Sequence, residues 1–168
     1  MPNTFGGDVD VTAETSRARD WPCLRQFCVF MENRVGRLHD LLRQVERHDL
    51  RVLGLSVVDT VDFAAARVIV DQTDRARELL QLSKFTVIET DVLGVHLGDS
   101  PQPFVEIYQS LMTAEINVHY TYPMLYRRDG RGAVVLHVDD IDQATSILRS
   151  RNHRLLTEGD LLDDDEYF

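Results

Sequence analysis

The feature that most constrains this chain is an internal repeat, because a unit written twice restricts the fold to two copies of one small architecture. Three pairs of segments carry the repeat: residues 29–33 with 95–99, residues 49–52 with 115–118, and residues 70–76 with 138–144. The third pair has an offset longer by two residues, and we assign that slip to a hairpin turn. The repeat predicts two similar units side by side.

Hydrophobic periodicity predicts the same order of elements in each copy: strand, helix, strand, strand, helix, strand. In the first copy the expected strands are residues 24–32, 50–58, 63–70 and 85–89, with helices over 35–48 and from Thr73 or Asp74 onward. In the second copy the expected strands are 92–98, 117–125, 133–138 and 154–158, with helices over 102–114 and 141–151. A hairpin turn is expected over 127–132, which is rich in glycine.

This order is the ferredoxin-like split βαβ arrangement. We therefore expect an α+β protein with two ferredoxin-like βαββαβ units in tandem, each an antiparallel sheet with its helices on one face, and with all helices on a common side. One such unit has a marginal core, so two packed together make physical sense. The expected parts are a mobile N-terminal tail (1–22), two domains (23–91 and 92–160) and an acidic C-terminal tail (161–168).

Composition excludes several classes of function. A formal net charge of −10 argues against nucleic-acid binding, which needs clustered Lys and Arg. No apolar run approaches the roughly 20 residues that span a bilayer, so we expect no membrane partner and a cytoplasmic location. Cys23 and Cys28 match neither a redox nor a metal motif and are interpreted as ordinary thiols.

The most informative local segment is Glu32–Leu38, between the first expected strand and the first expected helix. Gly36 lets the backbone approach a ligand closely, and unpaired amides at a helix start attract a carboxylate. A glycine there also suits a tight strand-to-helix turn with no ligand at all. The residues alone leave both interpretations open.

The segment ENRVGRL at residues 32–38 resembles the loop after the first strand of ACT domains, which typically reads Asn or Asp, any residue, Pro, Gly, any residue, Leu. It is similar to ENRPGVL in the serine-sensing domain of phosphoglycerate dehydrogenase, with Val35 in place of Pro and Arg37 in place of Val. The chain is thus identified as a tandem ACT domain protein. The resemblance implies a regulatory module that binds an amino acid.

In paired ACT domains the effector usually lies between the loop of one domain and the second strand of its neighbour. The resemblance therefore implies a hydrogen bond from Asn33 to the effector, and it assigns a second contact to Asn117. The full set of candidate binding residues is Asn33, Arg34, Val35, Gly36, Arg37, Leu38, Asn117 and Asp99. Asp99 stands at the position of Asn33 in the second copy, where Gln102 replaces Gly36, so the resemblance does not extend to a second equivalent site.

The expected function is that of a sensor that modulates amino-acid metabolism, without catalysis and without a cofactor, because none of the common catalytic or nucleotide-binding motifs is present. The partners expected are an amino-acid effector and a biosynthetic enzyme subunit. The alternative is a small regulatory subunit of acetolactate synthase, which would act through protein contact. That subunit should have a different C-terminal domain, whereas here residues 92–160 repeat the first unit.

A homodimer is expected, because one sheet face of the first copy is too apolar to remain in water. The residues assigned to this face are Cys28, Phe30, Leu53, Leu55 and Ile69. His96 and His137 are expected to come close on the outer sheet face of the second copy. A polar face or a dimer contact is favoured over a metal site, because no cysteine or spaced carboxylate accompanies them.

Overall fold

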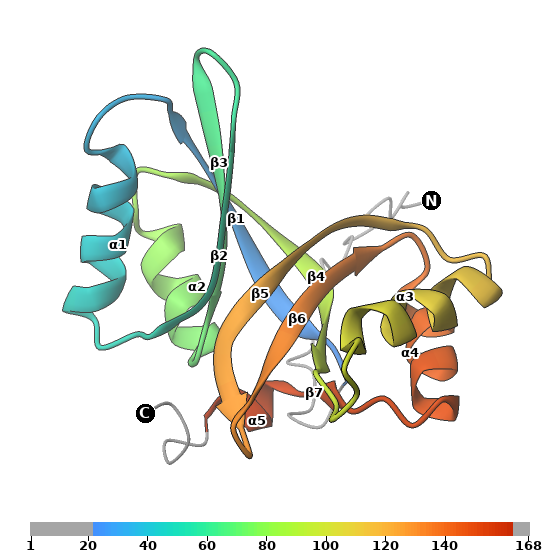
Figure 1. Ribbon diagram of the computed structural model, residues 1–168. Helices are drawn as coiled ribbons and strands as arrows, with labels where there is room; N and C mark the ends of the chain where they lie inside the picture. The colour runs from blue at the N-terminus through green and yellow to red at the C-terminus, as the bar shows by residue number, and fades with distance from the viewer. Residues whose placement is uncertain (1–21, 163–168) are drawn as a thin grey trace, which may run out of the picture.

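The computed structural model describes residues 22–162, and its elements follow the predicted order in both copies (Figure 1). The strands are β1 (Leu24–Glu32), β2 (Val52–Asp59), β3 (Phe63–Val70), β4 (Thr86–His96), β5 (Val118–Arg128), β6 (Arg131–Val138) and β7 (Leu155–Leu156). The helices are α1 (Arg37–Arg47), α2 (Thr73–Gln81), α3 (Pro103–Thr113), α4 (Ile141–Ser150) and α5 (Glu158–Leu161). The expected N-terminal tail and most of the acidic tail lie outside the described residues. Leu161, which we assigned to that tail, instead ends α5 and is buried.

The repeat extends to the backbone geometry at the ends of the first helix in each copy. Asp49 and Glu115 both have positive φ angles, 52° and 57°. The next amide then bonds back into the helix in both copies, from Leu50 to the Val45 carbonyl at 3.2 Å and from Ile116 to the Leu111 carbonyl at 3.0 Å. Two helices therefore end in the same way although their sequences differ.

The same correspondence holds where the second strand of each copy begins. The Arg51 amide donates to Asp71 Oδ1 at 3.0 Å, and the Asn117 amide donates to Asp139 Oδ1 at 3.2 Å. The offset between corresponding residues of the two copies increases by two within the hairpins, as predicted. In the second hairpin Asp129 and Gly130 both have positive φ angles, which is the geometry of a tight two-residue turn.

One strand serves both units. We expected separate strands over 85–89 and 92–98, but β4 runs without a break from Thr86 to His96. Its first part pairs with β1 and its second part pairs with β6 and β7, all antiparallel. The sheet order β1-β3-β2-β5-β6-β4-β7, with the additional pairing of β1 with β4, therefore closes the sheet on itself.

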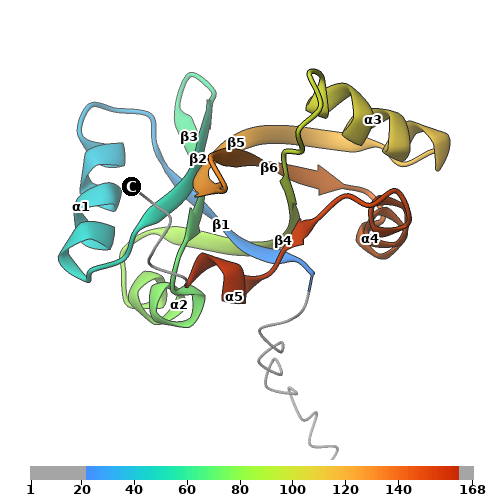
Figure 2. The same ribbon diagram turned by 60° about the horizontal axis from the view of Figure 1, so that its bottom comes forward.

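The closed sheet separates three clusters of buried side chains. One cluster lies under α1 and α2 and includes Leu41 and Leu80. A second lies under α3 and α4 and includes Ile107. The third fills the space between the two halves of the sheet, where Ile69 meets Val135. The helices consequently cover opposite sides of the molecule, not the common side that we expected (Figure 2).

The third cluster corrects the apolar face assigned to the first copy. Leu53 and Ile69 are 3% and 0% exposed, because the second unit covers them within the same chain. A β-bulge between Val52 and Gly54 shifts the register, so Leu55 pairs with Val68 and belongs to the face on which the helices lie. Of the expected patch, Phe30 is exposed and Cys28 is half-buried.

The last expected strand, 154–158, is also shorter than predicted. Only Leu155 and Leu156 pair with β4, and Thr157 then caps the short helix α5. Thr157 and Asp160 bond each other's backbone amides, which is a capping box that favours a helix start. No helix within residues 22–162 has the length and apolar character needed to cross a membrane.

Candidate functional site

The loop between β1 and α1 holds the most specific of the predicted residues. Gly36 is the N-cap of α1 and has a φ of 91°, and no described side chain caps the helix. The Asn33 side chain donates hydrogen bonds to Asp59 Oδ2 at 3.2 Å and to the Thr60 carbonyl at 2.9 Å. The Asn33 amide also donates to the Asp62 carbonyl at 2.8 Å. The loop is thus tied to the β2–β3 turn of its own unit.

The other predicted residues of this loop differ in how exposed they are. Val35 is fully exposed, at 103% of its reference area, and Arg34 pairs with Glu32 at 2.9 Å in an exposed position. Leu38 packs against the core under α1 and α2. Arg37 lies over the Phe85 ring, 5.2 Å from its centroid. An exposed apolar residue beside a helix start leaves room for a partner at this loop.

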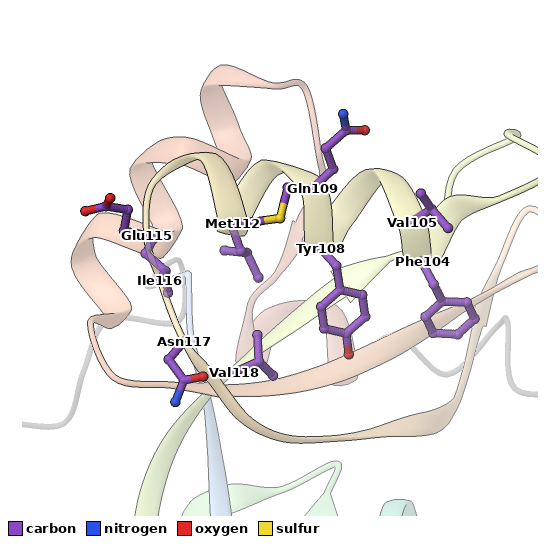
Figure 3. Close-up of a pocket in the computed structure, with 10 residues that line it drawn as sticks. Phe104, Val105, Tyr108, Gln109, Met112, Glu115, Ile116, Asn117 and Val118 are labelled. Atoms are coloured by element: carbon purple, nitrogen blue, oxygen red, sulfur yellow. The ribbon is translucent and has the colours of Figure 1, made fainter.

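Asn117, the candidate from the second unit, lines a groove between α3 and β5 (Figure 3). The groove encloses about 970 Å³, and its lining is predominantly apolar: Phe104, Val105, Tyr108, Gln109, Leu111, Met112, Glu115, Ile116, Asn117 and Val118. Phe104 and Tyr108 point from α3 toward β5. The buried Tyr108 hydroxyl has no hydrogen-bond partner within the described part of the chain. The groove therefore combines apolar walls with an unsatisfied polar group.

The second-copy counterpart of the loop makes different contacts from the first. Asp99 forms an ion pair with Arg131, and the Gln102 amide donates to Ser100 Oγ at 3.1 Å. Gln102 is the N-cap of α3 and Pro103 follows it, whereas Gly36 caps α1 with a positive φ angle. The two loops therefore differ in backbone conformation as well as in residue type.

The chain does not bring the two predicted halves of the site together. The loop at 33–36 and the α3–β5 connection that carries Asn117 lie at opposite sides of the molecule in both views (Figures 1 and 2). No pocket found in residues 22–162 is lined by both Asn33 and Asn117. A site built from both residues would need a second molecule.

A polar stack that we did not predict lies between the two units. The Arg67 guanidinium sits 3.7 Å from the Tyr120 ring centroid, and that ring stacks on His137 at 4.8 Å. His119 is 5.2 Å from His137. Burial lowers the pKa of His137 below its ordinary value, and the positive charges of His119 and Arg67 act in the same direction.

The expected approach of His96 to His137 was wrong. His96 pairs with Ala133 across the strands, and its Nε2 lies 3.3 Å from the Arg128 carbonyl. His137 pairs with Tyr120 instead, after a register shift near the start of β5. Within residues 22–162 there is no cluster of metal-ligating side chains.

Comparison with known proteins identifies the fold. Residues 23–164 match the model of a family described as an ACT domain pair. A solved protein of Bacteroides thetaiotaomicron is 24% identical and has a TM-score of 0.76, with 84% of this chain and 96% of that chain covered. The ligand-free regulatory subunit of aspartate kinase from Thermus thermophilus is 13% identical and has a TM-score of 0.54. That match covers 80% of this chain and 95% of the subunit. At these identities both structures show a common fold. No curated protein matches the sequence.

Proposed function

The chain belongs to the family of ACT domain pairs, and from that premise we propose that it is a non-catalytic regulatory protein that binds an amino acid and so modulates amino-acid metabolism. The observation that carries the proposal is the β1–α1 loop, where Gly36 takes a left-handed conformation at an uncapped helix start. Amides at such a start favour a carboxylate. We expect the protein to act in the cytoplasm, and Cys28 is present as a thiol.

We further propose that the effector binds between two copies of the chain. The β1–α1 loop, which carries Asn33, and the α3–β5 connection, which carries Asn117, lie on opposite sides of one molecule (Figures 1 and 2). Asn117 lines the apolar groove beside α3, in which Phe104 and Met112 are exposed. A second copy that covers this groove with its β1–α1 loop would shield the apolar side chains and would bring its own Asn33 toward Asn117. In this proposal the homodimer uses α3 and not the sheet face predicted from the sequence.

The alternative function, a small regulatory subunit of acetolactate synthase, finds less support. That alternative predicts a C-terminal domain with a fold different from the first unit. Residues 92–160 instead form a second unit with the same helix ends and strand starts as the first. A partner enzyme stays part of the proposal, because a regulatory domain without catalysis needs a target.

The proposal is tested by measuring thermal stability with each common amino acid in turn. A ligand present at 100 times its Kd adds about 2.7 kcal/mol to the free energy of unfolding, which raises the melting temperature measurably. Calorimetry then compares two variants with the amino acid that gives the largest shift. Asn33→Ala should weaken binding by about 1–3 kcal/mol, or roughly five-fold to more than a hundred-fold.

Asp99→Ala is the matched control, because it changes the corresponding residue of the other unit. Its ion pair with Arg131 is exposed, so the affinity should stay near that of the unchanged protein. Equal losses from Asn33→Ala and Asp99→Ala would show two equivalent sites. If no amino acid changes the melting temperature, the protein is not an amino-acid sensor.

A further inference from the structure

A second groove lies on the first unit, between α1 and the connection from α2 to β4. It encloses about 590 Å³, which is within the range of small-molecule sites. Its lining residues are Arg37, His39, Asp40, Arg43, Gln44, Arg47, Leu82, Ser83, Lys84 and Phe85. Of the candidate effector residues only Arg37 lines this groove, and residues 33–36 take no part in it.

The groove is strongly positive although the chain is acidic. Four of its lining residues are Arg or Lys, and Asp40 is the only lining carboxylate. The chain as a whole has a formal net charge of −10. Arg37 lies 3.6 Å from Asp40, and Arg43 lies 3.2 Å from Glu46. Arg47 and Lys84 form no ion pair within the described residues, so they are available to an anion.

Two buried polar atoms in the wall of this groove also lack partners. Arg37 Nε and Gln44 Oε1 are both shielded from solvent, and neither forms a hydrogen bond within residues 22–162. Atoms that water cannot reach are also out of reach of a ligand oxygen, so these two atoms do not identify the ligand. The contact with the Phe85 ring holds the Arg37 guanidinium in place. The Arg37 side chain as a whole is 30% exposed, so its charge can act on an anion in the groove.

The internal repeat shows that the fold does not require these cations. At the offset that relates α1 to α3, Arg37, Arg43 and Arg47 correspond to Pro103, Gln109 and Thr113. The second unit builds the same helix on the same sheet without any of the three positive charges. The positive groove is a property of the first unit alone.

We propose that this groove binds a small metabolite through a phosphate group. Phosphate oxygens accept hydrogen bonds from the planar fork of arginine and pair with the charge of lysine. The groove has the volume of a small-molecule site, which favours a compact ligand over an extended acidic peptide. The site adjoins the proposed amino-acid site at Arg37 and is otherwise built from different residues.

Calorimetry with inorganic pyrophosphate tests the proposal on the full chain. Pyrophosphate should bind with one site per chain, and the double variant Arg43→Gln, Arg47→Gln should lose about ten-fold or more in affinity. Arg37→Lys keeps the charge but removes the guanidinium fork, so it should also weaken binding. Arg75→Gln combined with Arg149→Gln removes two exposed charges from α2 and α4 and should bind as the unchanged protein does.

Three results would overturn the proposal. The first is no binding of pyrophosphate at low salt. The second is an equal loss of affinity in the groove variant and in the control variant, which would indicate general attraction to positive charge. The third is that a synthetic peptide with the acidic sequence of residues 162–168 binds in the groove while pyrophosphate does not.

Discussion

At the scale of single residues, backbone conformation separates the two strand-to-helix loops. Gly36 has a φ of 91°, and a Cβ added there would meet no atom within 4 Å. The glycine is therefore needed for its conformation and not for space. Its counterpart Gln102 has a φ of −132°, which any residue can adopt. A ligand that uses the Gly36 backbone thus meets a different surface at Gln102.

We predict that Gly36→Ala lowers the free energy of unfolding by about 1 kcal/mol, because an alanine in a left-handed conformation is strained. Urea unfolding measures the change. Gly98→Ala is the control, since Gly98 is equally open but has no positive φ angle. Equal effects of the two substitutions would show that the conformation of Gly36 is not the cause.

The sequence indicated the role of Gly36 but not the partners of Asn33. A glycine at a strand-to-helix junction is a local signal, and the left-handed turn follows from it. The bonds from Asn33 to Asp59 and Thr60 depend on how far the β2–β3 hairpin reaches. That reach depends on the register of three strands, which a bulge near Gly54 alters. Local patterns do not encode such long-range geometry.

At the scale of elements, α3 is unusual because it exposes apolar side chains to solvent. Its inner side packs on the second core through Ile107 and Leu111. Phe104, at its start, is exposed toward β5, and its outer side carries Val105 and Met112, both exposed. The corresponding residues of α1 are Leu38, His39 and Glu46. The apolar outer side occurs in one copy only, and it marks the surface that we propose for the second copy of the chain.

We predict that Met112→Glu shifts the protein from a dimer to a monomer of 19.3 kDa. Met112 is 68% exposed, so the monomer should fold normally, whereas a buried charge at the contact disfavours association. Light scattering at micromolar concentration measures the mass. Leu125→Glu is the control, because Leu125 is 71% exposed and belongs neither to the α3 groove nor to the β1–α1 loop.

Two outcomes would contradict this prediction. A monomeric unchanged protein would remove the proposed interface altogether. A Met112→Glu variant that is still dimeric, with a native circular dichroism spectrum, would place the contact elsewhere. The exposed sheet face around Phe30 would then be the next surface to test.

At the scale of the whole molecule, the space between the two halves of the sheet joins the units. Apolar side chains fill most of it, but Gln26 is also buried there. The Gln26 amide donates to the Tyr120 hydroxyl at 2.7 Å, and the Tyr122 hydroxyl donates to Gln26 Oε1 at 2.6 Å. Burial raises the pKa of Tyr122 above its ordinary value. The contact between the units is thus specific as well as apolar.

The stack of Arg67, Tyr120 and His137 makes this contact sensitive to pH. The pKa of His137 is lower in the folded protein than in the unfolded chain, where it is near 6.5. The unfolded chain therefore binds the proton more readily, so the free energy of unfolding should fall as the pH drops below about 6.5 toward the folded pKa. Above that range the stability contributed by neutral His137 is fully present.

We predict that His137→Asn reduces this loss of stability on acidification. Urea unfolding at about pH 7.5 and about pH 5.5 gives the difference for each variant. His39→Asn is the control, since His39 is exposed on α1. A pH dependence that is the same in the unchanged protein and in His137→Asn would rule out a contribution from this histidine.

The continuous strand β4 also limits how copies of this chain can combine. Domain swapping exchanges a unit between two chains, and it needs a hinge segment that can straighten between the units. Here the passage from one unit to the next is made by Asp91, Val92 and Leu93, which are already extended and paired with neighbouring strands. Within the described residues no hinge between the units can open without breaking strand pairs of the closed sheet. Any assembly built from this chain should therefore form by contact between intact molecules.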